Sequence, residues 1–210
     1  IGVAPEAAEE SWRHQQERAI QCLRDGIEAT PSPHATYSLI ADIFKKLVSG
    51  VFSIHCAESD EEWEMFTRGT GKLAEFVSER ATPPLSIRGG GYESPISFLA
   101  KNNLLPTHPW LAVHCNTLTD DDIILLKQSH ATVVHCPRSH AFFNHPPFPL
   151  EKLRAAGIPI AIGTDSLASC PNFDFLEELS TMREEFGFLE TEEILQMAGG
   201  MSVGAFADII

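Results

Sequence analysis

The 210-residue sequence is poor in basic residues and lacks a long apolar run. Its 15 lysines and arginines stand against 29 aspartates and glutamates, which gives a formal net charge of −14 at pH 7. A chain this acidic is a poor partner for phosphate backbones or anionic membranes, so we expect neither nucleic acid nor a membrane among its partners. Because no run of ~18 apolar residues occurs, we predict no transmembrane helix.

The sequence also lacks the cysteine and glycine motifs of several common protein classes. Its five cysteines are scattered and include no C-x-x-C pair, which is typical of a protein of the reducing cytoplasm rather than of a disulfide scaffold. No G-x-G-x-x-G or P-loop signature is present, so a nucleotide-binding doubly-wound sheet is not indicated. Hydrophobic residues make up 43% of the chain, enough for a buried core and too many for a mainly disordered protein.

Short apolar segments alternate with segments of helical periodicity along the chain. Strands are expected over residues 27–30, 51–55, 110–114, 131–135 and 158–163. Helices are expected over residues 6–25, 37–49, 60–66, 73–77, 120–129, 149–156, 173–185 and 191–198, and after the Ser94-Pro95 cap. Such an alternation indicates parallel βαβ units and an α/β fold.

Polar residues stand at the ends of these apolar segments. They are His34, His55, His114, His135 and Asp165. Because parallel strands share a direction, their carboxyl ends converge on one face, where barrel active sites are built. Imidazoles and a carboxylate that meet there suit a divalent metal such as Zn²⁺. For any single histidine, the alternative is a hydrogen-bonded, partly buried residue without a chemical role.

The dipeptide His-Cys occurs three times, at 55–56, 114–115 and 135–136. A mixed cysteine and histidine zinc site is one interpretation. Adjacent side chains of a strand point to opposite faces, however. If each histidine faces the barrel interior, each cysteine faces the helix layer, and we expect the cysteines to be small buried hydrophobic residues.

Five stretches of the sequence together resemble the amidohydrolase superfamily. They are S-P-H-A-T-Y-S (32–38), H-C-A-E-S (55–59), L-A-V-H-C-N-T-L (111–118), V-V-H-C-P-R-S-H (133–140) and A-G-I-P-I-A-I-G-T-D-S-L-A-S (156–169). Their order and spacing look most like the deaminase and chlorohydrolase branch, which includes cytosine, guanine, S-adenosylhomocysteine and aminodeoxyfutalosine deaminases. The resemblance implies a (β/α)8 TIM barrel, of which this chain holds about strands 4 to 8. It divides the chain into a partial barrel, 1–198, and the start of a returning β-sandwich segment, 199–210.

The resemblance also implies an activity and a set of site residues. The expected enzyme is a hydrolase of carbon–nitrogen bonds other than peptide bonds, which deaminates a purine, pyrimidine or related small heterocycle with a metal-activated water. One divalent metal is implied, with Zn²⁺ favoured over Fe²⁺, and its ligands would be His55 and Asp165. The catalytic residues would be Glu58, His114 and Asp165. Glu58 would move a proton to the ring nitrogen or leaving group, His114 would polarise the attacking water or the carbonyl being formed, and Asp165 would take a proton from the metal-bound water. The substrate-binding residues would be His34, His135, Arg138 and Ser166.

Two of these assignments have alternatives in the residues themselves. Glu58 precedes two further glutamates, so it is also interpretable as an acid at a helix N-terminus, where the helix dipole favours negative charge. Arg138 is equally interpretable as a solvent-exposed side chain. The resemblance further leaves a homo-oligomer open, because members of the family often assemble into dimers or larger forms.

The sequence departs from the family's pattern in its metal ligands and its ends. The H-x-H pair of the family's first strand occurs nowhere in the 210 residues, and the fourth-strand segment lacks a metal-bridging lysine, which favours a single metal. A (β/α)8 barrel takes ~250 residues, so we expect the chain to begin part-way through the barrel, with Ile1-Gly2 as the tail of a third strand. We also expect it to skip a segment near Ala198-Gly199 and to end inside the sandwich.

Three alternatives to a deaminase follow from the same residues. The site would also suit hydrolytic removal of chloride or hydrolysis of a cyclic amide. A non-enzymatic alternative is a catalytically inactive fragment, because two of four ligands would bind a metal weakly.

Overall fold

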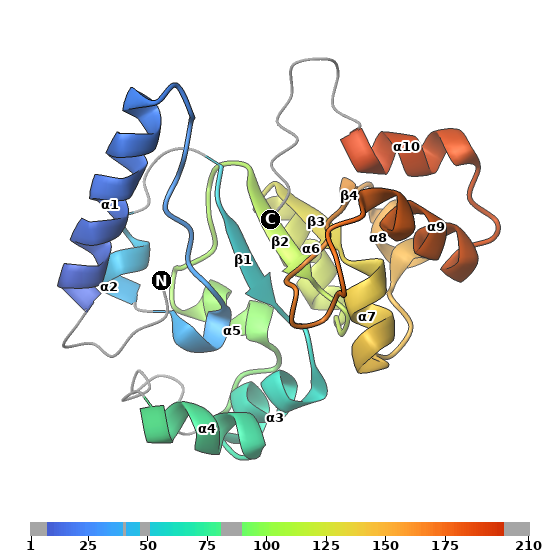
Figure 1. Ribbon diagram of the computed structural model, residues 1–210. Coiled ribbons are helices and arrows are strands. Elements are labelled where there is room, and N and C mark those ends of the chain that lie inside the picture. Colours follow the sequence, from blue (N-terminus) through green and yellow to red (C-terminus); the bar gives the residue numbers. More distant parts are fainter. Residues whose placement is uncertain (1–7, 40, 47–50, 81–89, 200–210) are drawn as a thin grey trace.

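The centre of the computed structural model is a four-stranded parallel sheet (Figure 1). The structure describes residues 8–39, 41–46, 51–80 and 90–199. The strands lie in the order β1-β2-β3-β4 and comprise β1 (Ser53–Cys56), β2 (Trp110–His114), β3 (Ala131–His135) and β4 (Ile160–Ile162). Since all three pairings are parallel, the carboxyl ends of the four strands lie at one edge of the sheet. The α/β fold predicted from the alternation is confirmed.

Helices form the connections between the strands, as parallel pairing requires. Before β1 lie α1 (Ala8–Arg24), η2 (Thr36–Ser38) and α2 (Ala41–Phe44). The connection from β1 to β2 contains α3 (Asp60–Arg68), α4 (Lys72–Arg80) and α5 (Pro95–Lys101). The connection from β2 to β3 contains α6 (Asp120–Gln128), and the connection from β3 to β4 contains α7 (Pro137–Phe143) and α8 (Leu150–Ala156). After β4 come α9 (Phe175–Glu185) and α10 (Thr191–Gly199). Figure 1 shows α1 at the β1 side of the molecule and α9 and α10 at the β4 side.

Helix starts that the sequence predicts are built as expected. The Ser94 side chain accepts a hydrogen bond from the Ser97 N–H at the start of α5, and the Thr119 side chain accepts one from the Asp122 N–H at the start of α6. The Ser94 hydroxyl also donates to the Asp122 carboxylate. The capping groups of α5 and α6 are therefore joined in one buried network.

The two faces of the sheet carry separate hydrophobic clusters. Ala112 and Val133 belong to the large cluster that the sheet shares with the helices. Val113, Val134 and Cys136 form a small cluster on the other face, which corresponds to the inside of a barrel. Val113 pairs with Val134 in the β2–β3 register, so these two neighbouring residues point to the same face of the sheet.

The assignment of residues to the two faces corrects the expectation that each histidine faces the barrel interior and each cysteine faces the helix layer. Cys56 packs in the helix-side cluster as predicted, with its Sγ 3.7 Å from Cys115 Sγ. Cys136 lies on the inner face instead. His135 precedes it within β3, so alternation sends the His135 side chain to the helix layer. All five cysteines of the chain are free thiols.

Several predicted elements differ in the structure. Residues 27–30 form no strand; a single parallel bridge joins Ala35 to His55 instead. The helix expected over 37–49 is divided into η2 and the short α2, and its last part, 47–50, lies outside the described residues. The helix α7 was not predicted, because seven residues are too few to show a 3.6-residue period.

The expected sandwich segment lies almost wholly outside the described residues, as does the Ile1-Gly2 strand. Gly199, the first residue of that segment, is the last residue of α10. Within the described ranges, no helix is both long and apolar enough to cross a membrane.

Candidate metal centre

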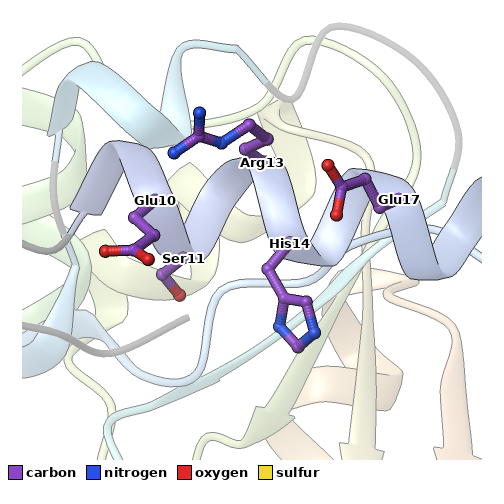
Figure 2. Close-up of a pocket in the computed structure, with 5 residues that line it drawn as sticks. All are labelled: Glu10, Ser11, Arg13, His14 and Glu17. Carbon is purple, nitrogen blue, oxygen red and sulfur yellow. The ribbon is translucent and has the colours of Figure 1, made fainter.

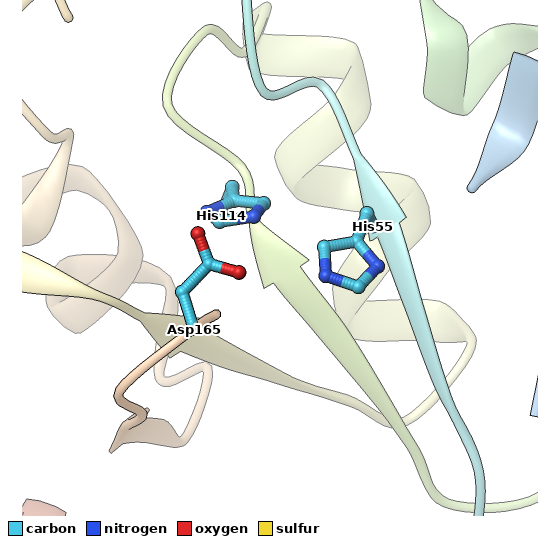
Figure 3. A group of neighbouring side chains, drawn as sticks. All are labelled: His55, His114 and Asp165. Carbon is cyan, nitrogen blue, oxygen red and sulfur yellow. The ribbon is translucent and has the colours of Figure 1, made fainter. Parts of the chain in front are cut away.

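Three ionisable side chains meet at the carboxyl edge of the sheet. Figure 3 shows His55 from β1, His114 from β2 and Asp165 from the segment after β4 pointing toward one another. One nitrogen or oxygen of each lies within 4.8 Å of the other two. Two imidazoles and a carboxylate are a common donor set for Zn²⁺ and related divalent ions.

Left-handed backbone turns bring these side chains together. His114 has a φ of 73° and Cys115 a φ of 51°, while Ala57 and Asp165 have φ values of 51° and 59°. Non-glycine residues seldom adopt such values, which cost roughly 1–3 kcal/mol each and cluster at functional sites. The turn at His114 breaks the strand alternation that would send its side chain toward the helices, whereas His135, in the regular part of β3, keeps that alternation.

The ring of His55 is fixed by a backbone acceptor. Its Nδ1 lies 2.6 Å from the carbonyl oxygen of His34. A carbonyl oxygen accepts only, so Nδ1 carries the hydrogen and Nε2 keeps its lone pair. Metal-ligating histidines are held in this way by a second hydrogen bond. His55 Nε2 is thus prepared as a ligand atom.

Asp165 is held by two serine hydroxyls. Ser139 Oγ and Ser169 Oγ lie 2.5 Å and 3.0 Å from Asp165 Oδ2, so Oδ1 is the oxygen left for a ligand bond. Burial by itself raises the pKa of Asp165. The serine hydrogen bonds and the nearby imidazoles of His114 and His55 outweigh burial and lower the pKa below its ordinary value. Asp165 is therefore a carboxylate at neutral pH.

His114 is a neutral imidazole, and one of its ring nitrogens has no hydrogen-bond partner among the described residues. Burial, followed by the charge of His55, lowers its pKa to about 3. Its Nε2 is buried and has no hydrogen-bond partner among the described residues. A buried nitrogen of this kind normally has a partner. Because it faces the two other members of the cluster, a bound ion or an ion-held water fits the residues present.

Glu58 stands beside this cluster, with its Oε1 3.7 Å from His114 Nε2. Burial, then the charges of Glu62 and Asp165, raise the pKa of Glu58 to about 7. Its backbone is held on both sides, since its N–H donates to Glu62 Oε2 at 2.7 Å and its carbonyl accepts from Asn116 Nδ2 at 3.0 Å. Glu58 directly precedes Ser59, the N-cap of α3, so it does lie near a helix N-terminus, as its alternative interpretation expects. A carboxyl group with a pKa near neutrality suits proton transfer.

Glu62 is a buried carboxyl group that the sequence did not single out. It is 1% exposed, and its side chain accepts hydrogen bonds from the Thr36 hydroxyl and the Glu58 N–H. Burial raises its pKa to about 7 against the lowering effect of these hydrogen bonds. No pattern of spacing in the sequence pointed to Glu62 or to the two serines that donate hydrogen bonds to Asp165. Ser139 and Ser169 do lie within the stretches that carry the family resemblance.

The predicted substrate-binding residues occupy different places. The ring of His34 lies 5.3 Å from that of His55, and the exposed Ser166 follows Asp165. Arg138 instead binds the carboxylates of Glu177 and Glu178 on α9, at 2.8 Å and 3.6 Å. His135 is fully buried and bonded to Glu185. The structure thus brings His34 to the cluster and directs His135 and Arg138 toward α9.

A separate surface hollow lies along α1 (Figure 2). Its lining residues are Glu10, Ser11, Arg13, His14 and Glu17. All five belong to one helix, and none of the site residues described above lines it. We therefore assign it no part in the site.

The fold and the side-chain cluster define the class of protein. Parallel strands with helical connections, and a metal-type donor set at their carboxyl ends, describe part of a (β/α)8 barrel with its site on the usual face. The chain belongs to the amidohydrolase family, which it matches over residues 4–199. The predicted fold and family are confirmed.

Two similar proteins agree with this assignment. The aminodeoxyfutalosine deaminase of Deinococcus radiodurans is 28% identical over 223 residues, which cover 95% of this chain and 51% of that protein. The 5-methylthioadenosine/S-adenosylhomocysteine deaminase of Pyrococcus furiosus is 36% identical over 174 residues, covering 80% and 38%. The chain therefore spans about half, or less, of the length of these relatives.

A solved structure shows the same fold. The crystal structure of an adenosine deaminase from Xanthomonas campestris with bound zinc superposes with a TM-score of 0.67 at 23% sequence identity. The match covers 90% of this chain and 42% of that one. It confirms the barrel architecture.

Proposed function

We propose that the protein to which this chain belongs is a metal-dependent aminohydrolase that removes an exocyclic amino group from a purine, pyrimidine or related heterocycle. The observation that carries the proposal is the meeting of His55, His114 and Asp165 beside Glu58. The names of the two relatives, both deaminases, favour a heterocycle that carries an amine over one that carries chloride. The zinc of the adenosine deaminase structure favours Zn²⁺ over Fe²⁺.

Each residue has a task that its surroundings support. A divalent metal, when bound, supplies a nucleophile at neutral pH by lowering the pKa of water from ~15.7 to ~7. His55 Nε2 and Asp165 Oδ1 would hold the metal, and the carboxylate of Asp165 would also accept a proton from the attacking water. His114, neutral at pH 7, orients that water through its Nε2. Glu58 exchanges a proton with the ring nitrogen and the departing amine, because its pKa of about 7 lets it both give and take one.

The remaining predictions belong to this proposal. His34 and Ser166 contact the substrate, which is a small molecule. His135 and Arg138, bonded to α9, take no part in substrate binding in this account. We place the enzyme in the reducing cytoplasm, in keeping with its five free thiols, and its assembly into a homo-oligomer stays a prediction.

Ammonia release by the full-length protein tests the proposal. A panel of aminated, chlorinated and cyclic-amide heterocycles separates deamination from dechlorination and ring opening. We expect ammonia from an aminated heterocycle, loss of activity on chelation, and recovery with Zn²⁺. Glu58→Gln should lower turnover at least ~10²-fold, the low end for a proton-transfer group, while Glu61→Gln, a matched change at an exposed glutamate of α3, should not. Chloride release or ring opening without ammonia, or full activity of the chelated enzyme, would contradict it.

A further inference from the structure

A second group of ionisable side chains lies in the helix layer. His135 at the end of β3, His140 on α7 and Glu185 at the end of α9 each present one ligand atom within 4.8 Å of the other two. His135 Nε2 lies 3.1 Å from Glu185 Oε2, and His140 Nδ1 lies 3.8 Å from Glu185 Oε1. The three residues share no member with the cluster around His55.

His140 presents one ring nitrogen to a backbone carbonyl and the other to the Glu185 carboxylate. His140 Nε2 lies 2.8 Å from the Pro146 carbonyl oxygen, which only accepts, so Nε2 carries the hydrogen. In the neutral ring, Nδ1 then presents a lone pair to the Glu185 carboxylate. Two lone-pair-bearing groups repel each other unless a proton or a cation lies between them.

His135 adds a buried nitrogen without a partner. Its side chain is 0% exposed. Its Nδ1 is buried without a hydrogen-bond partner among the residues that the structure describes. A buried nitrogen of this kind normally has a hydrogen-bond partner.

The surroundings of the group are apolar on one side and open on the other. The ring of Phe148 stacks on that of His135 with a centroid separation of 4.0 Å, and Phe186 meets it edge-on at 6.2 Å. The Glu185 side chain is 24% exposed. Apolar walls strengthen electrostatic attraction within a site, and the exposure of Glu185 provides an entry path.

From this geometry we infer that His135, His140 and Glu185 form a second divalent-cation site, of the zinc-binding type. In a tetrahedral zinc site with bonds of ~2.0–2.1 Å, ligand atoms lie ~3.3 Å apart. His135 Nε2 lies 3.1 Å from Glu185 Oε2 and His140 Nδ1 lies 3.8 Å from the other oxygen, Oε1, on either side of this value. The Pro146 carbonyl acts as the outer acceptor that fixes a ligating histidine. Such an ion ties β3 and α7 to α9, and α7 also carries Ser139, which holds Asp165.

Titration of the full-length protein with Zn²⁺ alone, after its metal has been removed by a chelator, tests the inference. The number of zinc ions bound per chain is measured by inductively coupled plasma mass spectrometry. We expect Glu185→Gln and His140→Gln each to bind one ion fewer than the wild type. Glu184→Gln, a matched change at the neighbouring exposed residue, should bind as many as the wild type. Loss of a direct ligand should weaken the site at least ~100-fold, since even outer partners contribute ~10- to 100-fold.

The Asp165→Asn background separates this inference from the proposed function. There, Glu185→Gln should still remove one ion whether or not the first site binds metal. Histidine ring resonances of the wild type, followed by NMR during the titration, need no variant: those of His135 and His140 should shift as the ion binds. Unchanged zinc binding by Glu185→Gln and His140→Gln, or unshifted His135 and His140 resonances at saturation, would overturn the inference.

Discussion

The buried carboxyl group of Glu62 predicts a specific pH dependence of stability. Its pKa is raised from the ordinary 4.5 to about 7 in the folded protein. Between these values the unfolded chain has released the proton that the folded chain still holds, so the free energy of unfolding falls as pH rises from about 4.5 to 7 and then levels off. A shift of this size corresponds to about 3 kcal/mol, at 1.36 kcal/mol for each pKa unit.

The substitution Glu62→Gln removes this titration and preserves the shape of the side chain. The carboxamide oxygen accepts from the Glu58 N–H, and its NH₂ group donates to the Thr36 hydroxyl, which turns to accept. At pH 5 the variant should match the wild type in its free energy of unfolding. At pH 8 it should be the more stable protein by up to about 3 kcal/mol.

Urea unfolding of wild type and variant at pH 5, 6, 7 and 8 measures the difference. The matched control is Glu61→Gln, at an exposed position next to Glu62, which should follow the wild type at every pH. The charge of Glu62 contributes to the raised pKa of Glu58, so Glu62→Gln also lowers the pKa of Glu58, and both effects favour the variant at pH 8. A Glu62→Gln variant less stable than the wild type at pH 8, or equally displaced at all pH values, would refute the reasoning.

Two further predictions concern positions around the site and a helix cap. Ser139→Ala removes one of the two hydroxyls on Asp165 and should weaken zinc binding ~10- to 100-fold, the usual effect of an outer partner; a zinc titration with unchanged affinity would show that Ser169 suffices. Thr119→Ala removes the side-chain cap of α6 and should lower the free energy of unfolding by about 1 kcal/mol, whereas Thr119→Ser should restore it; equal urea midpoints for all three proteins would contradict the cap's contribution.

The meeting of the strand ends was predictable because it depends on strand direction. Parallel strands place their carboxyl ends together, so the proximity of His55 and Asp165 could be predicted without knowledge of side-chain geometry. Helix starts at Ser94 and Thr119 were predictable for a similar reason, since capping is decided within four residues of sequence.

The direction of individual side chains was not predictable from the same pattern. His114 and His135 both end apolar strands and both precede a cysteine. A left-handed turn at His114 brings its ring to the cluster, whereas regular extended backbone at His135 sends that ring to α9. The apolar run and the His-Cys pair that the two segments share do not distinguish them.

Burial of charged residues depended on distant parts of the chain. Glu62 resembles the exposed acids beside it, and its burial follows from its contact with Thr36, 26 residues earlier. Arg138 pairs with glutamates of α9 instead of facing solvent, again through a contact between distant segments. Tertiary packing decides such pairings, and the periodicity of apolar residues within one helix does not predict which distant residue a charged side chain will contact.

The measurement that tests the central claim most directly is the zinc content and ammonia release of the full-length protein, compared between wild type and Asp165→Asn. This substitution keeps the shape of the side chain and its acceptor oxygen for the two serines, while it removes the ligand charge. The account predicts that the variant loses the zinc bound between His55 and Asp165 and, with it, at least ~10²-fold in ammonia release. A variant that keeps its zinc and its activity would contradict the account.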